Sequence, residues 1–390
     1  MNNDLCSQIL NTIKNCLPKN LEKIELHEPY FIGNEIQYVT DCIKTNWVST
    51  RGKYVDLFEE KISEFTSVNF SIATQSGTAA LHSCLEILGT ETNDEILVPD
   101  ITFVATVNSI AYCNAIPHFV DCCFETLGVD YLKLDGYLKK ITKKSNGECY
   151  NKLTNRRIKS LLVMHTFGHP VDLDPILEIC KNYKLNLVED AAEALGTFYK
   201  NKHVGSWGRL SILSFNGNKI ITTGSGGMIL TNDEKLAKLA KHITTTARIA
   251  HKWQIKHDMI GYNYRMSNVN AAIGCAQMEN MQDYLKRKRK LAEKYENEFK
   301  KVDGVKFFQE PSFARSNYWL NVLLLDEKNK SLKNDLLELT NNNKIATRPL
   351  WELMHKLPMY RKCPKMDLTN AININERLIN IPSSVFLTDE

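Results

Sequence analysis

The chain has 390 residues, of which 43% are hydrophobic and 24% are charged, and its formal net charge is +4. This composition excludes a mainly disordered chain, because disordered chains are poorer in apolar residues. A charge excess this small gives no indication of nucleic-acid binding. The richest apolar stretch, residues 96–112, is too short and too polar to span a bilayer, so we predict no membrane insertion.

The N-terminal residues predict a helix. Apolar side chains recur at helical spacing from Leu5 to Leu17, and Pro18 ends the pattern. No basic leader followed by an apolar stretch is visible, and the 11 cysteines are scattered without a C-x-x-C pair. We therefore expect a cytoplasmic protein with free thiols and no metal site.

From residue 70 onwards, seven short apolar segments alternate with helical patterns. Alternation of this kind, with apolar strands, predicts an α/β domain with a largely parallel sheet. The expected strands are 70–75, 95–101, 116–122, 160–166, 185–191, 210–216 and 226–232, and the helical patterns between them include 78–88 and 173–183.

The sequence becomes more charged and helical after residue 270. A long helix is expected over 271–303, and its KRKRK block at 286–290 is interpreted as a solvated face, because acidic residues flank it. A strand is expected over 318–325. We predict an N-terminal helix within 1–25, a large domain over 26–270 and a smaller α+β domain over 271–390.

The segment SFNGNKIITTGSGGMI places Lys219 just past an apolar strand. Gly217 precedes this lysine and three glycines follow it. A lysine that forms a Schiff base with a bulky ring needs such a permissive backbone, because the chain passes close to the ring. A surface lysine on a turn is the equally open alternative.

Asp190 stands at the carboxyl end of the strand LNLVED. Open α/β sheets place ligand-binding groups there, and a carboxylate at this point would pair with a protonated pyridine nitrogen. The alternative is that Asp190 caps the following helix.

A strand also ends at TQSGTAAL, where Ser76, Gly77 and Thr78 turn into an Ala-rich helix. Free backbone amides and the positive end of the helix dipole bind phosphate well. A plain capped helix start is the alternative reading.

A phosphate-binding turn, a partner for a ring nitrogen and a glycine-flanked lysine together describe a site for pyridoxal phosphate. The motifs SGTAAL, TFVAT, EDAAEA, SFNGNK with TTGSGG, GYNYRM and TRPLW follow in an order that resembles the sugar-nucleotide aminotransferase family (DegT type), a branch of the fold-type I pyridoxal-phosphate enzymes. The resemblance runs from about residue 25 to the C-terminus. It implies a mainly parallel seven-stranded sheet between helices in the cofactor-binding domain, and a homodimer with shared active sites.

The resemblance also assigns roles to single residues. Lys219 matches the Schiff-base lysine, which also moves the proton, and Asp190 matches the partner of the pyridine nitrogen. Glu193 lies beside the ring oxygen, where many members carry Gln. The other implied cofactor contacts are Phe103 stacked on the ring, Gly77, Thr78 and Ser214 at the phosphate, and Asn263 reaching the phosphate from the other subunit.

Substrate contacts are implied for segments that have ordinary packing as their alternative. His165 lies in MHTFGHP, where Gly168 and Pro170 disfavour a metal site with His169, because they break the helix that would align the two histidines. The other expected substrate contacts are Trp47, Ser49 and Arg51 in one loop, and Arg348, Trp351 and His355 in the smaller domain.

The activity implied by the resemblance is transfer of an amino group from L-glutamate to C4 of a nucleotide-linked 4-keto-6-deoxy sugar. LHEPYFIGNE and NWVSTRGKYVDLFEE are most similar to the subgroup that makes UDP-4-amino sugars for legionaminic acid and bacillosamine-type glycans, which predicts UDP-2-acetamido-2,6-dideoxy-4-keto-glucose as substrate. GDP- and dTDP-linked sugars and a non-catalytic cofactor-binding regulator are the alternatives. Lys219 argues against a deoxysugar dehydratase, since those members carry His there.

Overall fold

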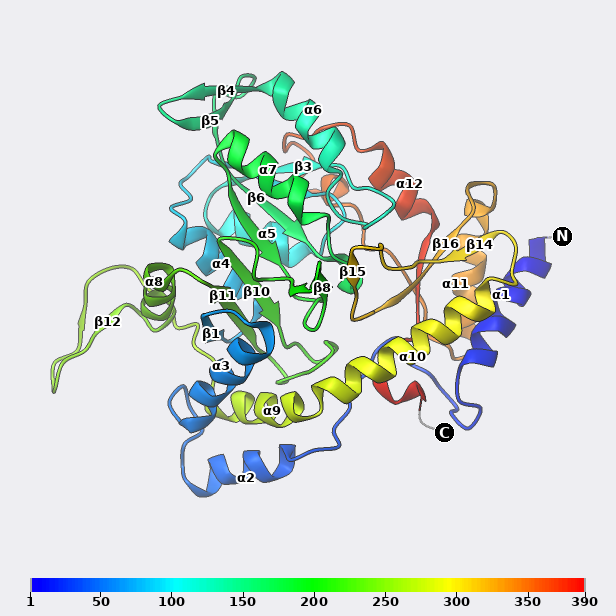
Figure 1. The fold of residues 1–390 in the computed structure, drawn as a ribbon, viewed down its shortest axis with the longest axis horizontal. Coiled ribbons are helices and arrows are strands. Elements are labelled where there is room, and N and C mark those ends of the chain that lie inside the picture. Colours follow the sequence, from blue (N-terminus) through cyan, green and yellow to red (C-terminus); the bar gives the residue numbers. More distant parts are fainter. Residues whose placement is uncertain (1, 389–390) are drawn as a thin grey trace.

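One large mixed sheet organises the fold (Figure 1). The structure is a computed structural model that describes residues 2–388. The seven strands predicted between residues 70 and 232 all lie in this sheet, which confirms the expected α/β class, and two further strands bring the sheet to nine strands. Their spatial order is β1 (Phe70–Thr74), β11 (Gly227–Thr231), β10 (Leu210–Ser214), β7 (Asn186–Asp190), β6 (Arg157–Met164), β2 (Glu95–Pro99) and β3 (Ile116–Val120).

The strand directions define one functional edge. β10, β7, β6, β2 and β3 pair in parallel, whereas β11 runs antiparallel to both of its neighbours, β10 and β1. β1 therefore points the same way as the parallel strands, so their carboxyl ends meet at one edge. Open α/β sheets bind ligands outside this edge. The hairpin of β4 (Thr142–Ser145) and β5 (Glu148–Asn151) extends the sheet beside β6.

Helices cover the sheet on both faces, with α7 in front of β6 and α5 behind it in Figure 1. α7 (Leu173–Tyr183) buries an apolar stripe, because Leu173, Ile176 and Cys180 are buried at helical spacing. The other helices of this part are α2 (Glu35–Lys44), α3 (Lys53–Thr66), α4 (Gly77–Ile87), α5 (Val104–Tyr112), α6 (Tyr131–Ile141), α8 (Glu234–Thr244) and α9 (Asn268–Glu279).

The C-terminal part builds its own antiparallel sheet, in the order β14 (Val305–Phe307), β16 (Asn321–Leu325), β18 (Leu378–Ile381) and β17 (Arg348–Pro349). This arrangement matches the expected smaller α+β unit. The N-terminal helix α1 (Asn2–Cys16) packs on this part of the molecule, against α10 (Met281–Phe299) and α11 (Lys333–Asn342). The helix α12 (Thr369–Arg377) precedes β18.

Two smaller sheets lie outside the two main ones. β15 (Ala314–Arg315) pairs with β8 (Phe198–Tyr199), which pairs with β9 (Lys202–His203), so the two parts share a small sheet. A hairpin of β12 (Arg248–Ile249) and β13 (Lys256–His257) projects from the body at the left of Figure 1. No helix among the described residues is long and apolar enough to cross a membrane.

The buried apolar residues of α9 and α10 belong to different hydrophobic clusters for most of their length. Buried residues of α9 belong to the core under the large sheet, whereas Leu291, Tyr295 and Phe299 of α10 belong to the core that also contains α1. We propose the division into a large domain over 26–270 and a smaller domain over 271–390. The packing places the change of core within α10, beyond Asn280.

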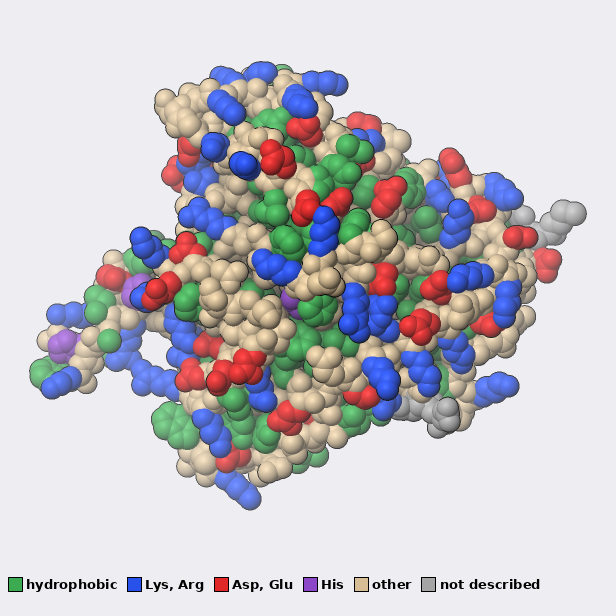
Figure 2. Space-filling model, viewed as in Figure 1, with side chains coloured by type: hydrophobic (Ala, Val, Ile, Leu, Met, Phe, Trp, Pro, Cys, Tyr) green, Lys and Arg blue, Asp and Glu red, His purple; other side chains and the backbone are tan. Residues whose placement is uncertain are grey.

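The long helix expected over 271–303 is two helices. Asn280 separates α9 from α10 and has non-helical backbone angles, while its N–H donates to the carbonyl of Gln277 and tightens the last turn of α9. The basic block is also not a uniform solvated face. Figure 2 shows Lys and Arg side chains gathered over α10, yet Lys288 is buried and donates to the carbonyls of Trp319 (3.1 Å) and Ser383 (2.6 Å).

Candidate active site

A cavity of about 330 Å³ lies at the carboxyl edge of the large sheet. Its walls come from the ends of β1, β7 and β10 and from the turns that follow them, because the strand directions bring these ends together. The residues predicted from the sequence that line this cavity are Gly77, Thr78, Phe103, Asp190, Glu193, Ser214, Lys219 and Trp351.

One corner of the cavity is the N-terminus of α4. The Ser76 hydroxyl accepts a hydrogen bond from the Ala79 N–H (3.1 Å) and caps the helix. The amides of Gly77 and Thr78 stand in the first turn, where a helix provides no intrahelical acceptor. A Cβ on Gly77 would come within 2.9 Å of the Ser214 Cβ, so glycine lets the helix end approach that serine. This corner fits a phosphate group.

Asp190 ends β7 in the middle of the sheet, between Met164 of β6 and Ile212 of β10. Its carboxylate is buried and accepts hydrogen bonds from the Thr106 hydroxyl (2.6 Å) and the Ala192 N–H (3.1 Å). Burial raises the pKa of Asp190, while these donors favour the ionised form. The expected helix after Asp190 is a turn, so its carboxylate holds a turn and caps no helix, and the side chain lines the cavity.

Lys219 reaches into the cavity from the loop after β10. Its Nζ lies 3.3 Å from Glu193 Oε1, and the other carboxylate oxygen of Glu193 accepts from the Phe167 N–H (2.8 Å). Burial raises the pKa of Glu193 to about 7, although the nearby Lys219 charge lowers it. The carboxyl group that replaces the usual Gln therefore titrates near neutral pH.

Aromatic rings close the opposite side. Phe103 precedes α5, is 48% exposed and has its ring centroid 5.9 Å from that of Trp351. Trp351 in turn lies 5.0 Å from Phe167, between centroids. A planar ligand entering the cavity would meet the Phe103 ring.

Three predicted substrate contacts do not line this cavity. His165 is buried behind it, with Nε2 3.0 Å from Glu189 Oε2. His355 is held by Asp100, whose carboxylate lies 2.6 Å from its Nδ1. Arg348 is exposed on β17 and donates to Asn341 Oδ1 (2.8 Å).

Four other predicted residues gather in a separate hollow of about 810 Å³. Trp47, Ser49, Arg51 and Asn263 all line it, next to the hairpin of β12 and β13. This hollow shares no lining residue with the cavity that contains Lys219. Within one chain, Asn263 is therefore not brought to the corner formed by α4.

Sequence reasoning missed Trp319, Asn317 and Thr106. The expected strand over 318–325 begins only at Asn321, and Tyr318 has a positive φ of 50°, which is not an extended-strand conformation. Trp319 lines the cavity, and its ring centroid lies 4.0 Å from Lys219 Nζ. No local pattern signals this contact, since the two residues lie in different parts of the fold.

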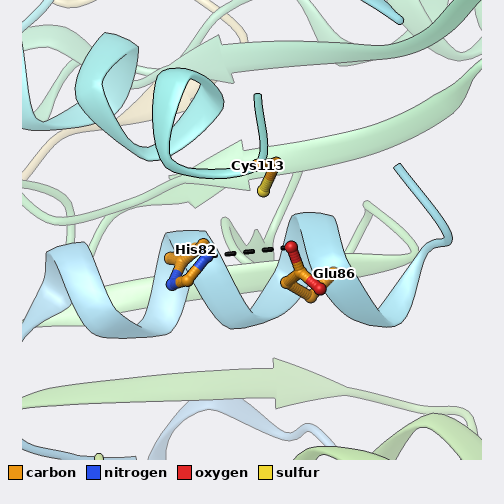
Figure 3. A group of neighbouring side chains, drawn as sticks. All are labelled: His82, Glu86 and Cys113. Atoms are coloured by element: carbon orange, nitrogen blue, oxygen red, sulfur yellow. Dashed lines mark ion pairs between the residues drawn. The ribbon is translucent and has the colours of Figure 1, made fainter. Parts of the chain in front are cut away.

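Among the described residues, one group of three possible metal-ligating side chains lies together: His82, Glu86 and Cys113 (Figure 3). Structural zinc sites use four protein ligands. Burial raises the pKa of the Cys113 thiol, so it stays protonated, and His82 Nδ1 lies 3.3 Å from the Tyr264 hydroxyl. We interpret the group as packing between α4 and α5.

The cavity fits pyridoxal phosphate by its donor set. The amide-lined corner suits the phosphate, Asp190 suits the ring nitrogen and Lys219 suits the carbonyl carbon. Asp190 ends β7 and Lys219 lies in the loop after β10, and these two strands are parallel neighbours in the sheet. A mainly parallel sheet with an acidic residue and a lysine at the carboxyl ends of neighbouring strands is typical of the fold-type I class of pyridoxal-phosphate enzymes.

Comparison with known proteins identifies the family. Residues 29–390 match the DegT/DnrJ/EryC1/StrS aminotransferase family, and the chain belongs to it. It is 37% identical to the GDP-perosamine synthase of Escherichia coli O157:H7, over 95% of this chain and 96% of that one. The GDP-perosamine synthase of Vibrio cholerae is 36% identical over 94% and 95% of the two chains.

A solved structure agrees with the fold. The aminotransferase TlmJ from Streptoalloteichus hindustanus superposes with a TM-score of 0.84 at 25% identity, over 94% of this chain and 95% of that one. The protein is a pyridoxal-phosphate-dependent sugar aminotransferase, as the sequence predicted.

Proposed function

We propose that the protein transfers an amino group from L-glutamate to C4 of a GDP-linked 4-keto-6-deoxy sugar. The similarity over nearly the whole chain to two GDP-perosamine synthases supports the GDP-linked substrate. The UDP-linked 2-acetamido sugar expected from the sequence is not confirmed, and the GDP alternative agrees better with these relatives.

The observation that carries the reaction type is the shared cavity of Lys219 and Asp190. Pyridoxal phosphate, when bound, supplies a ring that takes up the electrons released at an adjacent carbon. Asp190 would keep the ring nitrogen protonated, and Phe103 would hold the ring face. The Gly77 and Thr78 amides and the Ser214 hydroxyl would bind the phosphate.

Lys219 has two proposed tasks. Its Nζ would hold the cofactor at its carbonyl carbon, and as a free amine it would accept a proton from the donor carbon and deliver it to the neighbouring carbon. Glu193, 3.3 Å away, would stabilise the ammonium form of this lysine. A carboxyl group with a pKa of about 7 can do so at neutral pH without being permanently charged.

We further propose a homodimer in which the hollow with Trp47, Arg51 and Asn263 completes the partner's cavity. The projecting hairpin beside it exposes Trp253 and Ile255, which are 77% and 70% exposed. Large apolar side chains at this exposure favour burial against a second chain.

The protein is also proposed to be cytoplasmic. All 11 cysteines are described and free, and most of them are buried. Buried free thiols suit a reducing compartment, where they pack as small apolar groups.

The test is a panel of GDP-, UDP- and dTDP-linked 4-keto-6-deoxy sugars with L-glutamate, with products read by mass and NMR. We expect kcat/KM for the GDP-linked sugar to exceed the others by at least about tenfold, a difference of roughly 1.4 kcal/mol. A higher value for UDP-2-acetamido-2,6-dideoxy-4-keto-glucose would overturn the GDP assignment and restore the UDP one.

A Lys219→Ala variant is the control in the same assay. It should form no 2-oxoglutarate and no amino sugar, because it has no amine to carry the proton. Turnover near the wild-type rate in this variant would end the proposed mechanism, whichever sugar is used.

A further inference from the structure

The amine of Lys219 has a defined resting place in the structure. Its Nζ lies 4.0 Å from the centroid of the Trp319 ring on one side and 3.3 Å from Glu193 Oε1 on the other. The lysine side chain is only 13% exposed, so water does little to screen these two contacts. An ammonium group over an indole face is attracted by the ring quadrupole, and most strongly where it is desolvated.

Trp319 is held in place at three points. Its indole Nε1–H donates to the carbonyl of Asn218, the residue before Lys219, at 2.7 Å. Its backbone N–H donates to Asn317 Oδ1 (2.8 Å), and its carbonyl accepts from the buried Lys288 amine (3.1 Å). The ring therefore has little freedom to move away from Lys219.

The same short segment also fixes Glu193. Asn317 is fully buried, and its Nδ2 donates to the carbonyls of Glu193 and Leu195, each at 2.9 Å. Residues 317–319 come from the C-terminal part of the chain, whereas Glu193 and Lys219 come from the large sheet. The segment 317–319 therefore positions both neighbours of the Lys219 amine, the Trp319 ring and the Glu193 carboxylate.

We propose that Trp319 is a positioning residue that holds the free amine of Lys219 between its indole face and the Glu193 carboxylate. This inference rests on the proposed role of Lys219. When Nζ accepts the proton from the donor carbon it becomes a cation, and both neighbours stabilise that cation until the proton passes to the next carbon. No bond to Trp319 forms or breaks.

Two substitutions separate the indole face from its N–H. Trp319→Phe keeps an aromatic face, and Trp319→Leu does not, while both lose the hydrogen bond to Asn218. We expect Trp319→Leu to lower kcat roughly 5- to 30-fold with KM values nearly unchanged, and Trp319→Phe to recover most of the loss. Equal losses in the two variants would assign the effect to the N–H and overturn the proposal.

A second measurement does not depend on turnover. Full-length protein freed of cofactor is treated with an amine-reactive label, and labelling of Lys219 is followed by peptide mass spectrometry. Contact with the indole face and with Glu193 shields the amine from the label, so Trp319→Leu should be labelled several-fold faster than the wild type and Trp319→Phe at a rate in between. Unchanged labelling would overturn the proposal even if the sugar assignment holds, and faster labelling would support it even if that assignment fails.

Trp207 provides a matched control. Lys202 Nζ lies 4.5 Å from the centroid of its ring, a contact of the same kind that lies outside the cavity. Trp207→Leu should leave kcat and Lys219 labelling within about twofold of the wild type. If this control changed both as strongly as Trp319→Leu, general loosening of the fold would explain the result and the positioning role would be rejected.

Discussion

The Asp190 carboxylate both stabilises the local structure and lines the candidate active site. It accepts from Thr106 and Ala192 and also faces the cavity that contains Lys219. Burial raises its pKa, so the carboxylate is ionised most readily when a cation lies opposite. The protonated ring nitrogen of the cofactor would be that cation.

Asp190→Asn should separate these two tasks. The amide still accepts from the Ala192 N–H and can bond to the Thr106 hydroxyl, so the protein should fold. Activity should fall about 10- to 1000-fold, because a neutral amide no longer favours a protonated ring nitrogen by the 1–3 pKa units that a carboxylate provides. The measurements are kcat and the thermal unfolding midpoint. A fully active Asn variant would mean that Asp190 only holds the local turn.

Glu193 should make stability depend on pH. Its pKa rises from 4.5 to about 7 on folding, so the folded state binds the proton more tightly than the unfolded state does. The stability that this group contributes is therefore fully present below its pKa of 4.5 in the unfolded state, and it is lost as the pH rises through the folded-state pKa of about 7. Glu193→Gln has no ionisable group at this position and therefore lacks this loss. In cofactor-free protein, the unfolding free energy of the variant minus that of the wild type should be higher at pH 8 than at pH 5 by roughly 3 kcal/mol.

Urea unfolding of wild type and variant at the two pH values measures this difference. Comparing the two proteins at each pH cancels the titration of all groups that they share. A difference between variant and wild type that stays constant from pH 5 to pH 8 would mean that Glu193 is ionised throughout.

At the scale of elements, the site depends on a close approach between two segments. The turn at Thr166–Gly168 follows β6, and Gly168 has a positive φ of 92°. A Cβ there would lie 1.8 Å from Asn317 Oδ1, the side chain that also holds the Trp319 N–H and the Glu193 carbonyl. The glycine therefore allows the C-terminal segment to reach the active site.

Gly168→Ala should lower the free energy of unfolding by roughly 1–3 kcal/mol from the backbone alone, with the clash adding to it. It should also lower kcat, since Asn317 must shift. Gly136→Ala is the control, because Gly136 lies inside α6 with no atom within 4 Å of its added Cβ. That substitution should stabilise the protein by about 0.5–1 kcal/mol. Equal effects of the two substitutions in urea unfolding would refute the close-approach argument.

At the scale of the whole molecule, the separation of two hollows argues for a second chain. Asn263 lies with Trp47 and Arg51, apart from the amide-lined corner at α4 that it is expected to serve. A hydrogen bond from Asn263 to the partner's phosphate would be charge-assisted, so its loss should cost on the order of 1.5–3 kcal/mol of cofactor affinity.

Subunit mixing tests this arrangement. Lys219→Ala protein and Asn263→Ala protein should each be impaired, and a mixed dimer would contain one site with both an intact Lys219 and a partner Asn263. Random exchange of equal amounts should restore about one quarter of the wild-type activity. Mixing Lys219→Ala protein with a variant that carries both Lys219→Ala and Asn263→Ala should restore no activity. No recovery after confirmed exchange, or full activity as a monomer, would refute the shared site.

The sequence alone determined the seven strands of the large sheet between residues 70 and 232, several of the helices and the residues at the strand ends, because these follow from local patterns of apolar and turn residues. Asp190, Lys219 and the Ser76–Thr78 turn were identifiable for the same reason: each stands directly after an apolar run, and parallel strands bring such ends to one edge. The helix break at Asn280 and the burial of Lys288 could not be identified from the sequence, because both depend on what packs around them.

Only the tertiary structure decided which of these residues meet. Trp319 lies over Lys219, and Asn317 holds Glu193, through contacts between parts of the chain more than 90 residues apart, for which no local pattern exists. It also separated Asn263 and Arg51 from the cavity and placed His165 against Glu189. Local patterns specify elements because neighbouring residues share one backbone geometry, whereas a binding site depends on distances that are set only when whole elements pack.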